Sequence, residues 1–133
     1  MINRRLVLVL GLSALILLAA GCGDDDPVTF GEGEIPSSVP DDFPVPAGAV
    51  VGSTLVDRVN HRTEFAFTIA QEADAVVQYY TVGLVSAGFV VTSSESGLDF
   101  WQIEFSRGEL LGQLIISPGG SGLAAVVASF NTA

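Results

Sequence analysis

The spacing of apolar residues changes once along the chain, and this change constrains the fold more than any other feature. From Thr63 to Ile69 apolar and polar residues alternate, so Phe65 and Phe67 share one side of a strand. From Glu72 to Ala87 the apolar residues instead recur at helical spacing. Acidic residues in the first turn and Gly88 after the last are typical of helix ends. The sequence therefore predicts a half-buried strand followed by one helix.

Five further segments have the composition of strands and are separated by turns. They are Val50–Arg58, Phe89–Ser93, Phe100–Ser106, Leu110–Ser117 and Leu123–Phe130. The predicted order is β-β-α-β-β-β-β, which places the domain in the α+β class: a single curled antiparallel sheet of about six strands with one helix packed on it. In outline this element order is similar to the helix-on-sheet domains of some small envelope lipoproteins.

The predicted helix leaves part of the sheet to be covered in another way. One helix covers only part of one sheet face, so the sheet must curl around it or carry a second apolar face. Adjacent apolar pairs such as Leu110–Leu111 and Val126–Val127 place apolar side chains on both sides of the strands. This pattern indicates a covered second face, a dimer contact or a ligand groove. The proline-rich stretch Phe43–Gly48 is expected to be extended and to lie across a sheet edge.

Two features of the predicted helix concern its packing. Tyr79 and Tyr80 lie about 100° apart around a helix, so only one can face the core. Tyr80 belongs to the apolar stripe, which leaves Tyr79 more exposed. Gly83, inside the helix, is expected to let the helix lie close to the sheet.

The first 22 residues form three zones. Arg4 and Arg5 give a positive start, Leu6–Ala20 is an unbroken run of 15 uncharged, mostly apolar residues, and small residues then lead into Cys22. This is the layout of a secretory signal, and the run is short for a helix that crosses about 30 Å of hydrocarbon. An uncleaved anchor helix is the alternative, and the paired arginines also allow a twin-arginine export route.

The residues from Leu18 to Cys22 read Leu-Ala-Ala-Gly-Cys and resemble the lipobox of bacterial lipoproteins. Ala19 stands where that family prefers leucine. The resemblance, which covers only the first 22 residues, implies that residues 1–21 are a cleaved signal peptide and that the bond between Gly21 and Cys22 is cut. It also implies that Cys22 carries a diacylglycerol and often a further acyl chain such as palmitate. The protein would then be exported and anchored on the outer face of the cytoplasmic membrane or on the outer membrane.

An acidic segment follows the cysteine. Residues 22–42 hold seven acids and no base, and they are interrupted by prolines and glycines. Such a segment buries too little apolar surface to offset the entropy of ordering it. We therefore expect Cys22 to be followed by a disordered tether to residue 42 and a folded domain over 43–133. Fully extended, the tether's 18 residues from Gly23 to Pro40 would reach about 56 Å. Asp24–Asp26 could in principle bind calcium, but a bare acidic run is more typical of a solvated spacer.

Composition excludes several classes of function. The chain has five arginines, no lysine and a net charge of −10, which argues against a nucleic-acid partner. Its single cysteine excludes an intramolecular disulfide framework and any CxxC site, and its single histidine excludes multi-histidine zinc sites. A lone cysteine in an exported protein is also a reactive thiol, which thioether lipidation would remove.

The remaining chemistry-bearing residues do not form a catalytic pattern. His61 falls in a predicted turn beside Arg62 and near Asp57, where a solvated side chain is the usual outcome. Asp99 and Glu104 are five residues apart, and an odd separation along a strand points side chains to opposite faces. No GxSxG nucleophile motif is present. We therefore expect no enzyme, no catalytic residue, no metal site and no cofactor.

Two functions fit these observations. The first is a membrane-anchored cell-envelope lipoprotein whose domain is a non-catalytic protein-interaction or accessory module displayed outside the membrane. Trp101 is a candidate contact residue for this role, although it shares a face with Ile103 and Phe105 and is expected in the core. The alternative is a binding module for a small apolar ligand or lipid in the groove between helix and sheet.

Overall fold

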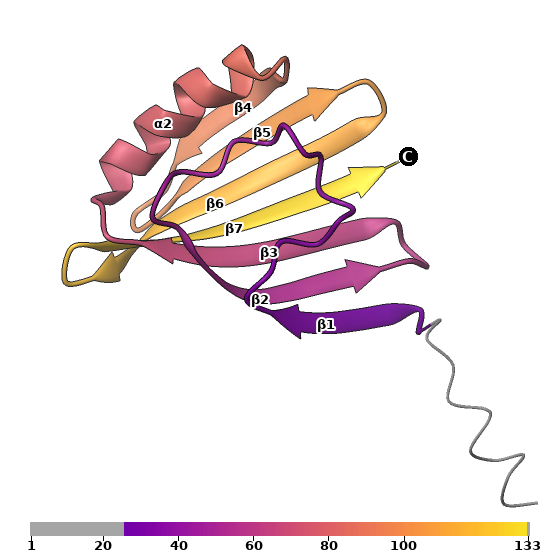
Figure 1. Ribbon diagram of the computed structural model, residues 1–133. Helices are drawn as coiled ribbons and strands as arrows, with labels where there is room; N and C mark the ends of the chain where they lie inside the picture. The colour runs from indigo at the N-terminus through magenta and orange to yellow at the C-terminus, as the bar shows by residue number, and fades with distance from the viewer. Residues whose placement is uncertain (1–25, 133) are drawn as a thin grey trace, which may run out of the picture.

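The computed structural model describes residues 26–132, which form one seven-stranded antiparallel sheet and one helix (Figure 1). In chain order the elements are β1 (Val28–Glu32), β2 (Val50–Asp57), β3 (Arg62–Ile69), α2 (Ala73–Ser86), β4 (Val90–Ser96), β5 (Trp101–Arg107), β6 (Leu110–Gly120) and β7 (Leu123–Thr132). Across the sheet the strand order is β1-β2-β3-β7-β6-β5-β4. The predicted antiparallel sheet with one helix is confirmed, and β1 is an additional strand. Within residues 26–132, no helix has the length and apolar character needed to cross a lipid bilayer.

Strand β1 lies inside the segment that composition predicts to be a disordered tether. Val28–Glu32 pairs with β2 along its whole length, and further on Val39 and Phe43 are buried in the core. The tether prediction over 22–42 is therefore wrong from Val28 onward, while residues 22–25 lie outside the described part of the chain. Composition misleads here because a strand added at a sheet edge is held by backbone hydrogen bonds, which any non-proline residue supplies.

The chain between β1 and β2, which we call the crossing segment (residues 33–49), passes over the same sheet face that α2 covers (Figure 1). Its anchor is Phe43, which is 5% exposed. The Phe43 ring meets the ring of Phe130 edge-on at 4.9 Å between centroids and stacks on the rings of Tyr80 and Phe105, each at 5.8 Å. The stretch Phe43–Gly48 thus lies across the face of the sheet, rather than across its edge as the prolines predict.

Alternate residues of the central strands fill the space beneath the helix and the crossing segment. The buried apolar strand residues are Phe65, Phe67, Ile69, Ile103, Phe105, Leu114, Ile116, Ala124, Val126, Ala128 and Phe130. The alternation predicted for Thr63–Ile69 is confirmed. Trp101 is partly buried and packs against this core, as its position beside Ile103 predicts.

Helix α2 contacts the core through one stripe. Tyr80 is fully buried and Tyr79 only partly so, as their helical positions predict. Burial raises the pKa of the Tyr80 hydroxyl well above its ordinary value, and Tyr79 adds to the rise. A side chain at Gly83 would first meet Pro44, 3.4 Å from the position of its Cβ, so this glycine admits the crossing segment rather than the sheet. Gly88 has a φ of 89° and ends the helix as predicted.

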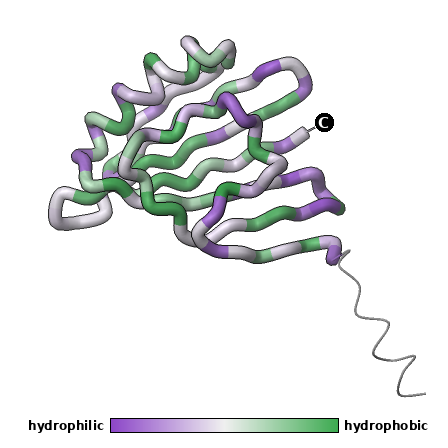
Figure 2. The backbone as a smooth tube through the Cα atoms, viewed as in Figure 1, coloured by the Kyte–Doolittle hydropathy of each residue, from purple (hydrophilic) through white to green (hydrophobic). Residues whose placement is uncertain are grey.

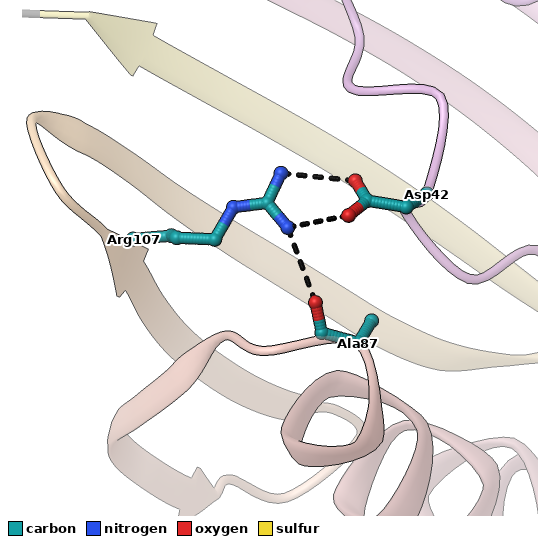
Figure 3. Close-up of polar contacts among 3 residues, drawn as sticks. All are labelled: Asp42, Ala87 and Arg107. Carbon is teal, nitrogen blue, oxygen red and sulfur yellow. Dashed lines mark hydrogen bonds and ion pairs between the residues drawn. The ribbon is translucent and has the colours of Figure 1, made fainter.

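Arg107, the last residue of β5, joins the crossing segment to the end of the helix (Figure 3). Its guanidinium donates hydrogen bonds to both carboxylate oxygens of Asp42, at 2.7 and 2.9 Å, and to the backbone carbonyl of Ala87, at 3.1 Å. It also lies 4.1 Å from the centroid of the Phe89 ring. The hydrogen bonds from Arg107 hold the pKa of Asp42 below its ordinary value. A cation is also favourable at this place, because the last carbonyls of a helix carry partial negative charge.

The role of Phe43 can be tested by truncation. We expect Phe43→Ala to lower the free energy of unfolding by about 3–5 kcal/mol, because it removes a buried ring and leaves a cavity. Urea unfolding followed by circular dichroism measures this change. Phe30→Ala is the matched control: Phe30 is 78% exposed, and its truncation should cost less than about 1 kcal/mol. Equal stabilities for the two variants would show that the crossing segment is not part of the core.

The pairing of Asp42 with Arg107 predicts a pH dependence of stability. Because the pKa of Asp42 is lower in the folded chain, the ionised carboxylate stabilises the fold above its ordinary pKa of 3.8. That contribution is lost as the pH falls through the lower, folded pKa. We expect Asp42→Asn to be less stable than the wild type at neutral pH and to lose less stability on acidification. Asp41→Asn is the control, since Asp41 makes no ion pair within residues 26–132. Identical pH profiles for the wild type and Asp42→Asn would contradict this assignment.

Candidate functional site: the open face of the sheet

The sheet face turned away from α2 is not covered by any described element (Figure 1). Because side chains alternate along each strand, the residues between the core positions all point to this open face. Four of them are apolar and well exposed: Phe30 in β1 at 78%, Val50 in β2 at 67%, Val90 in β4 at 62% and Leu111 in β6 at 59%. The expectation of apolar side chains on both sides of the sheet is thus met at these positions, and one of the two sides faces solvent.

One cross-strand row on the open face spans all seven strands. From β4 to β1 its members, each paired with the next, are Ser93, Glu104, Gln113, Ser129, Glu64, Leu55 and Phe30. The row is polar over β4, β5, β6, β7 and β3 and becomes apolar at β2 and β1. We call its members Glu104, Gln113, Ser129 and Glu64 the polar strip.

Hydrogen bonds hold the two carboxylates of the polar strip. Glu64 Oε2 accepts from the Arg62 guanidinium at 2.5 Å and from the Ser129 hydroxyl at 3.4 Å. Glu104 Oε1 accepts from the side-chain amide of Gln102 at 3.1 Å. Each carboxylate uses one oxygen in these contacts. The second oxygen of each is therefore free, within the described residues, to accept a hydrogen bond from a partner.

A hollow of about 380 Å³ lies over part of the polar strip. Its lining includes Glu104, Gln113 and Ser129 of the strip together with Leu111, Asn131 and Arg62 from the adjoining row. On the other side of the strip, Ile115 pairs with Val127 in the next row, and both of these apolar side chains are half-buried. A polar centre with apolar neighbours is a surface composition that suits protein recognition better than a dry ligand pocket.

Two further cavities lie on the side of the sheet that carries the crossing segment. One, of about 220 Å³, lies beside the β2–β3 turn, and the other, of about 400 Å³, lies against residues 35–45. None of the three cavities is lined by a residue of α2. Beneath α2 the space is instead filled by the helix side chains Val76, Tyr80 and Leu84, all of them fully buried.

The histidine singled out in the sequence lies in the β2–β3 turn, and the aspartate is the last residue of β2, directly before this turn. Asp57 accepts hydrogen bonds from the backbone N–H groups of Val59 and Asn60 at 3.0 and 3.1 Å and from the Asn60 side chain at 2.7 Å. These bonds, chiefly the one from the Asn60 side chain, hold the pKa of Asp57 below its ordinary value. His61 is exposed and has a φ of 53°. His61 thus lies in a turn, as predicted, and Asp57 holds the backbone of that turn.

The other candidate residues are separate from one another. Asp99 is exposed in the connection between β4 and β5, whereas Glu104 lies inside β5 on the open face. Gly21 and Cys22 lie outside the described residues. Within residues 26–132, no group of three or more histidine, cysteine or acidic side chains is placed to hold a metal ion.

The polar strip cannot be identified from the sequence alone. Alternation along each strand points Glu64 to the other side of the sheet from Phe65, and Glu104 to the other side from Ile103. Each acid could therefore be predicted to face away from the core. What brings them into one row is the pairing of β3 with β7, two strands that are far apart in the chain. Comparison of the chain with protein-family models, with curated proteins and with solved structures finds no match.

Proposed function

We propose that this protein is a lipid-anchored bacterial envelope protein, attached through Cys22, whose domain binds another envelope protein through the open face of its sheet. The role is that of a non-catalytic interaction module without a cofactor. One observation carries the proposal: a sheet with one face packed by a helix and the crossing segment leaves its opposite face, with Phe30 and Leu111 exposed, without cover. Exposed apolar side chains around a polar centre are typical of interaction surfaces.

The charges of the open face indicate the chemistry of the partner. The acids on this face include Glu64, Glu95 and Glu104, and Arg62 forms an ion pair with Glu64. A partner that presents lysine or arginine to the polar strip would complement this surface. The partner would also bury the exposed apolar side chains of Phe30 and Leu111, which lie on the same face as the polar strip.

The spacing of the acids favours binding over acid–base catalysis. Glu64 and Glu104 are three strand spacings apart, which corresponds to about 14 Å between their backbones. Carboxylate pairs in glycosidases work at separations of at most about 9.5 Å. The two acids are therefore better suited to contact two separate groups on a large partner than one small substrate.

The anchoring part of the proposal is supported by the resemblance to a lipobox from Leu18 to Cys22. We expect Cys22→Ser to abolish the incorporation of labelled fatty acid and to release the protein from the membrane fraction, because the serine hydroxyl cannot form the thioether. Labelling and sedimentation in cells measure both effects. A Cys22→Ser protein that still carries label and still sediments with the envelope would refute the anchor.

The binding part can be tested by photo-crosslinking in cells. We expect a photoreactive amino acid at Gln113, in the centre of the polar strip, to give one discrete adduct. The same amino acid at Val85, which is 62% exposed on the solvent side of α2, should give none.

The crosslink must also depend on charge. Replacing both Glu64 and Glu104 by glutamine should reduce the adduct at least about tenfold, since two charge-assisted contacts are worth about 1.5–3 kcal/mol each. An adduct of equal yield from Gln113 and Val85, or one that the double substitution leaves unchanged, would contradict a specific interface on the open face.

A further inference from the structure

We propose that the end of the sheet where β1 begins is a membrane-contacting surface, and that the β2–β3 turn around Arg58 and Val59 rests on anionic phospholipid head groups. This inference rests on the proposed lipid attachment at Cys22. It adds which part of the domain faces the bilayer and which lipid chemistry it contacts.

The first argument is the length of chain between Cys22 and the fold. The backbone carbonyls of Asp26 and Pro27 accept hydrogen bonds from the Arg58 guanidinium at 2.9 Å and from the Arg58 backbone N–H at 2.8 Å. The chain is thus fastened to the β2–β3 turn from Asp26 onward. Four Cα steps separate Cys22 from Asp26, which corresponds to at most about 14 Å. A lipid on Cys22 would therefore hold this turn close to the bilayer, not at the distance that a tether to residue 42 allows.

The second argument is the distribution of charge between the two ends of the sheet. The strand pairings Val28–Asp57, Arg62–Asn131 and Arg107–Leu110 place the start of β1, the β2–β3 turn, the β5–β6 turn and the end of β7 at one end. Figure 1 shows the β2–β3 turn beside the start of β1, and Figure 2 shows hydrophilic residues gathered in the turns at this end. All basic side chains of residues 26–132 lie there: Arg58, His61, Arg62 and Arg107. Acids at or toward the opposite end include Glu32, Glu72, Asp74, Glu95 and Asp99.

The third argument concerns the acids at the basic end. The Asp57 carboxylate is used by the backbone of its own turn, and the Asp42 carboxylate is bound by Arg107. Two exposed acids at this end oppose contact with an anionic surface: Asp26, whose carbonyl binds Arg58, and Glu109 in the neighbouring turn. Arg58 makes no ion pair within residues 26–132. Its charge is therefore available to a lipid phosphate.

The turn also has the shape and polarity that a lipid surface accepts. Val59, next to Arg58, is 66% exposed, so the tip of the turn combines a cation with an apolar side chain. Beside it, the cavity of about 220 Å³ has Arg58, His61 and Arg62 among its lining residues, together with apolar walls from Leu110 and Phe130. This combination is complementary to a phospholipid head group and the first part of its acyl chains.

This orientation defines where the partner of the proposed function must lie. With the basic end on the bilayer, the strands rise away from it, and an eight-residue strand spans about 26 Å. The open face then points sideways, along the membrane. Its partner is therefore a protein that lies in or on the same membrane and presents its basic groups within a few nanometres of the surface.

The experiment uses the chain from Cys22 to Ala133, which keeps every described residue and contains a single thiol. Coupling that thiol to a maleimide lipid in vesicles fixes the anchor chemically, whether or not cells lipidate Cys22. The vesicles contain phosphatidylcholine with or without phosphatidylglycerol and a nitroxide-labelled lipid. In a Trp101→Phe background, Val59→Trp reports on the proposed contact, and Leu98→Trp reports on the opposite end, where Leu98 is fully exposed.

We expect the nitroxide to quench the tryptophan of Val59→Trp several-fold more than that of Leu98→Trp, and only with phosphatidylglycerol present. Adding Arg58→Ser should lower the population in contact about fivefold, the effect of one basic residue near an anionic surface. Equal quenching at the two positions, or none at position 59, would overturn the proposal while leaving the anchor itself standing. Quenching at position 59 that is independent of phosphatidylglycerol would overturn the assignment to anionic lipid.

Hydrogen exchange provides a second measurement that needs no substitution. On the vesicle-coupled wild-type chain, we expect anionic lipid to slow exchange at residues 58–61 and to leave residues 97–99 unchanged. Unchanged exchange at residues 58–61 would also overturn the proposal, even if the tryptophan variants do not fold.

Discussion

The insertion of Phe43 into the aromatic core is the contact on which the rest of the structure depends. A helix of 14 residues is too small to cover one face of a seven-stranded sheet. The crossing segment supplies the missing cover, and Phe43 fixes it by stacking on Tyr80 and Phe105 and meeting Phe130 edge-on. Arg107 then holds the neighbouring Asp42 against the end of the helix. The helix and the crossing segment together cover one face of the sheet. No described element covers the other face, which is therefore the open face.

The parts of the fold that the sequence predicts are those set by local spacing. Alternation over Thr63–Ile69 and helical spacing over Glu72–Ala87 each depend on neighbours within one element, and both predictions are confirmed. Strand β1 was not predicted, because its five residues contribute no buried side chain and are held by pairing with β2. The position of Phe43 is also predicted only in part. A single apolar residue among prolines and acids gives no periodic signal, and the rings that Phe43 contacts are as distant in the sequence as Phe130.

The candidate site likewise has one part that local spacing predicts and another part that depends on strand pairing. Local alternation predicts that Glu64 and Glu104 face away from the core, and the structure agrees. The polar strip exists only because β7 pairs with both β3 and β6, and a single sequence does not reveal strand order. The basic end of the sheet is a further product of pairing. Arg58, Arg62 and Arg107 belong to two different turns, and only the register brings those turns to the same end.

The position of β7 has a consequence for how the sheet holds together. Leu123–Thr132 forms the strand between β3 and β6, and within the described residues its hydrogen bonds are the only sheet pairing that joins the half-sheet β1-β2-β3 to the half-sheet β6-β5-β4. Without this strand, the two half-sheets cannot pair with each other. A product cut short before Leu123 would lack the seam of its sheet and be exposed to proteolysis.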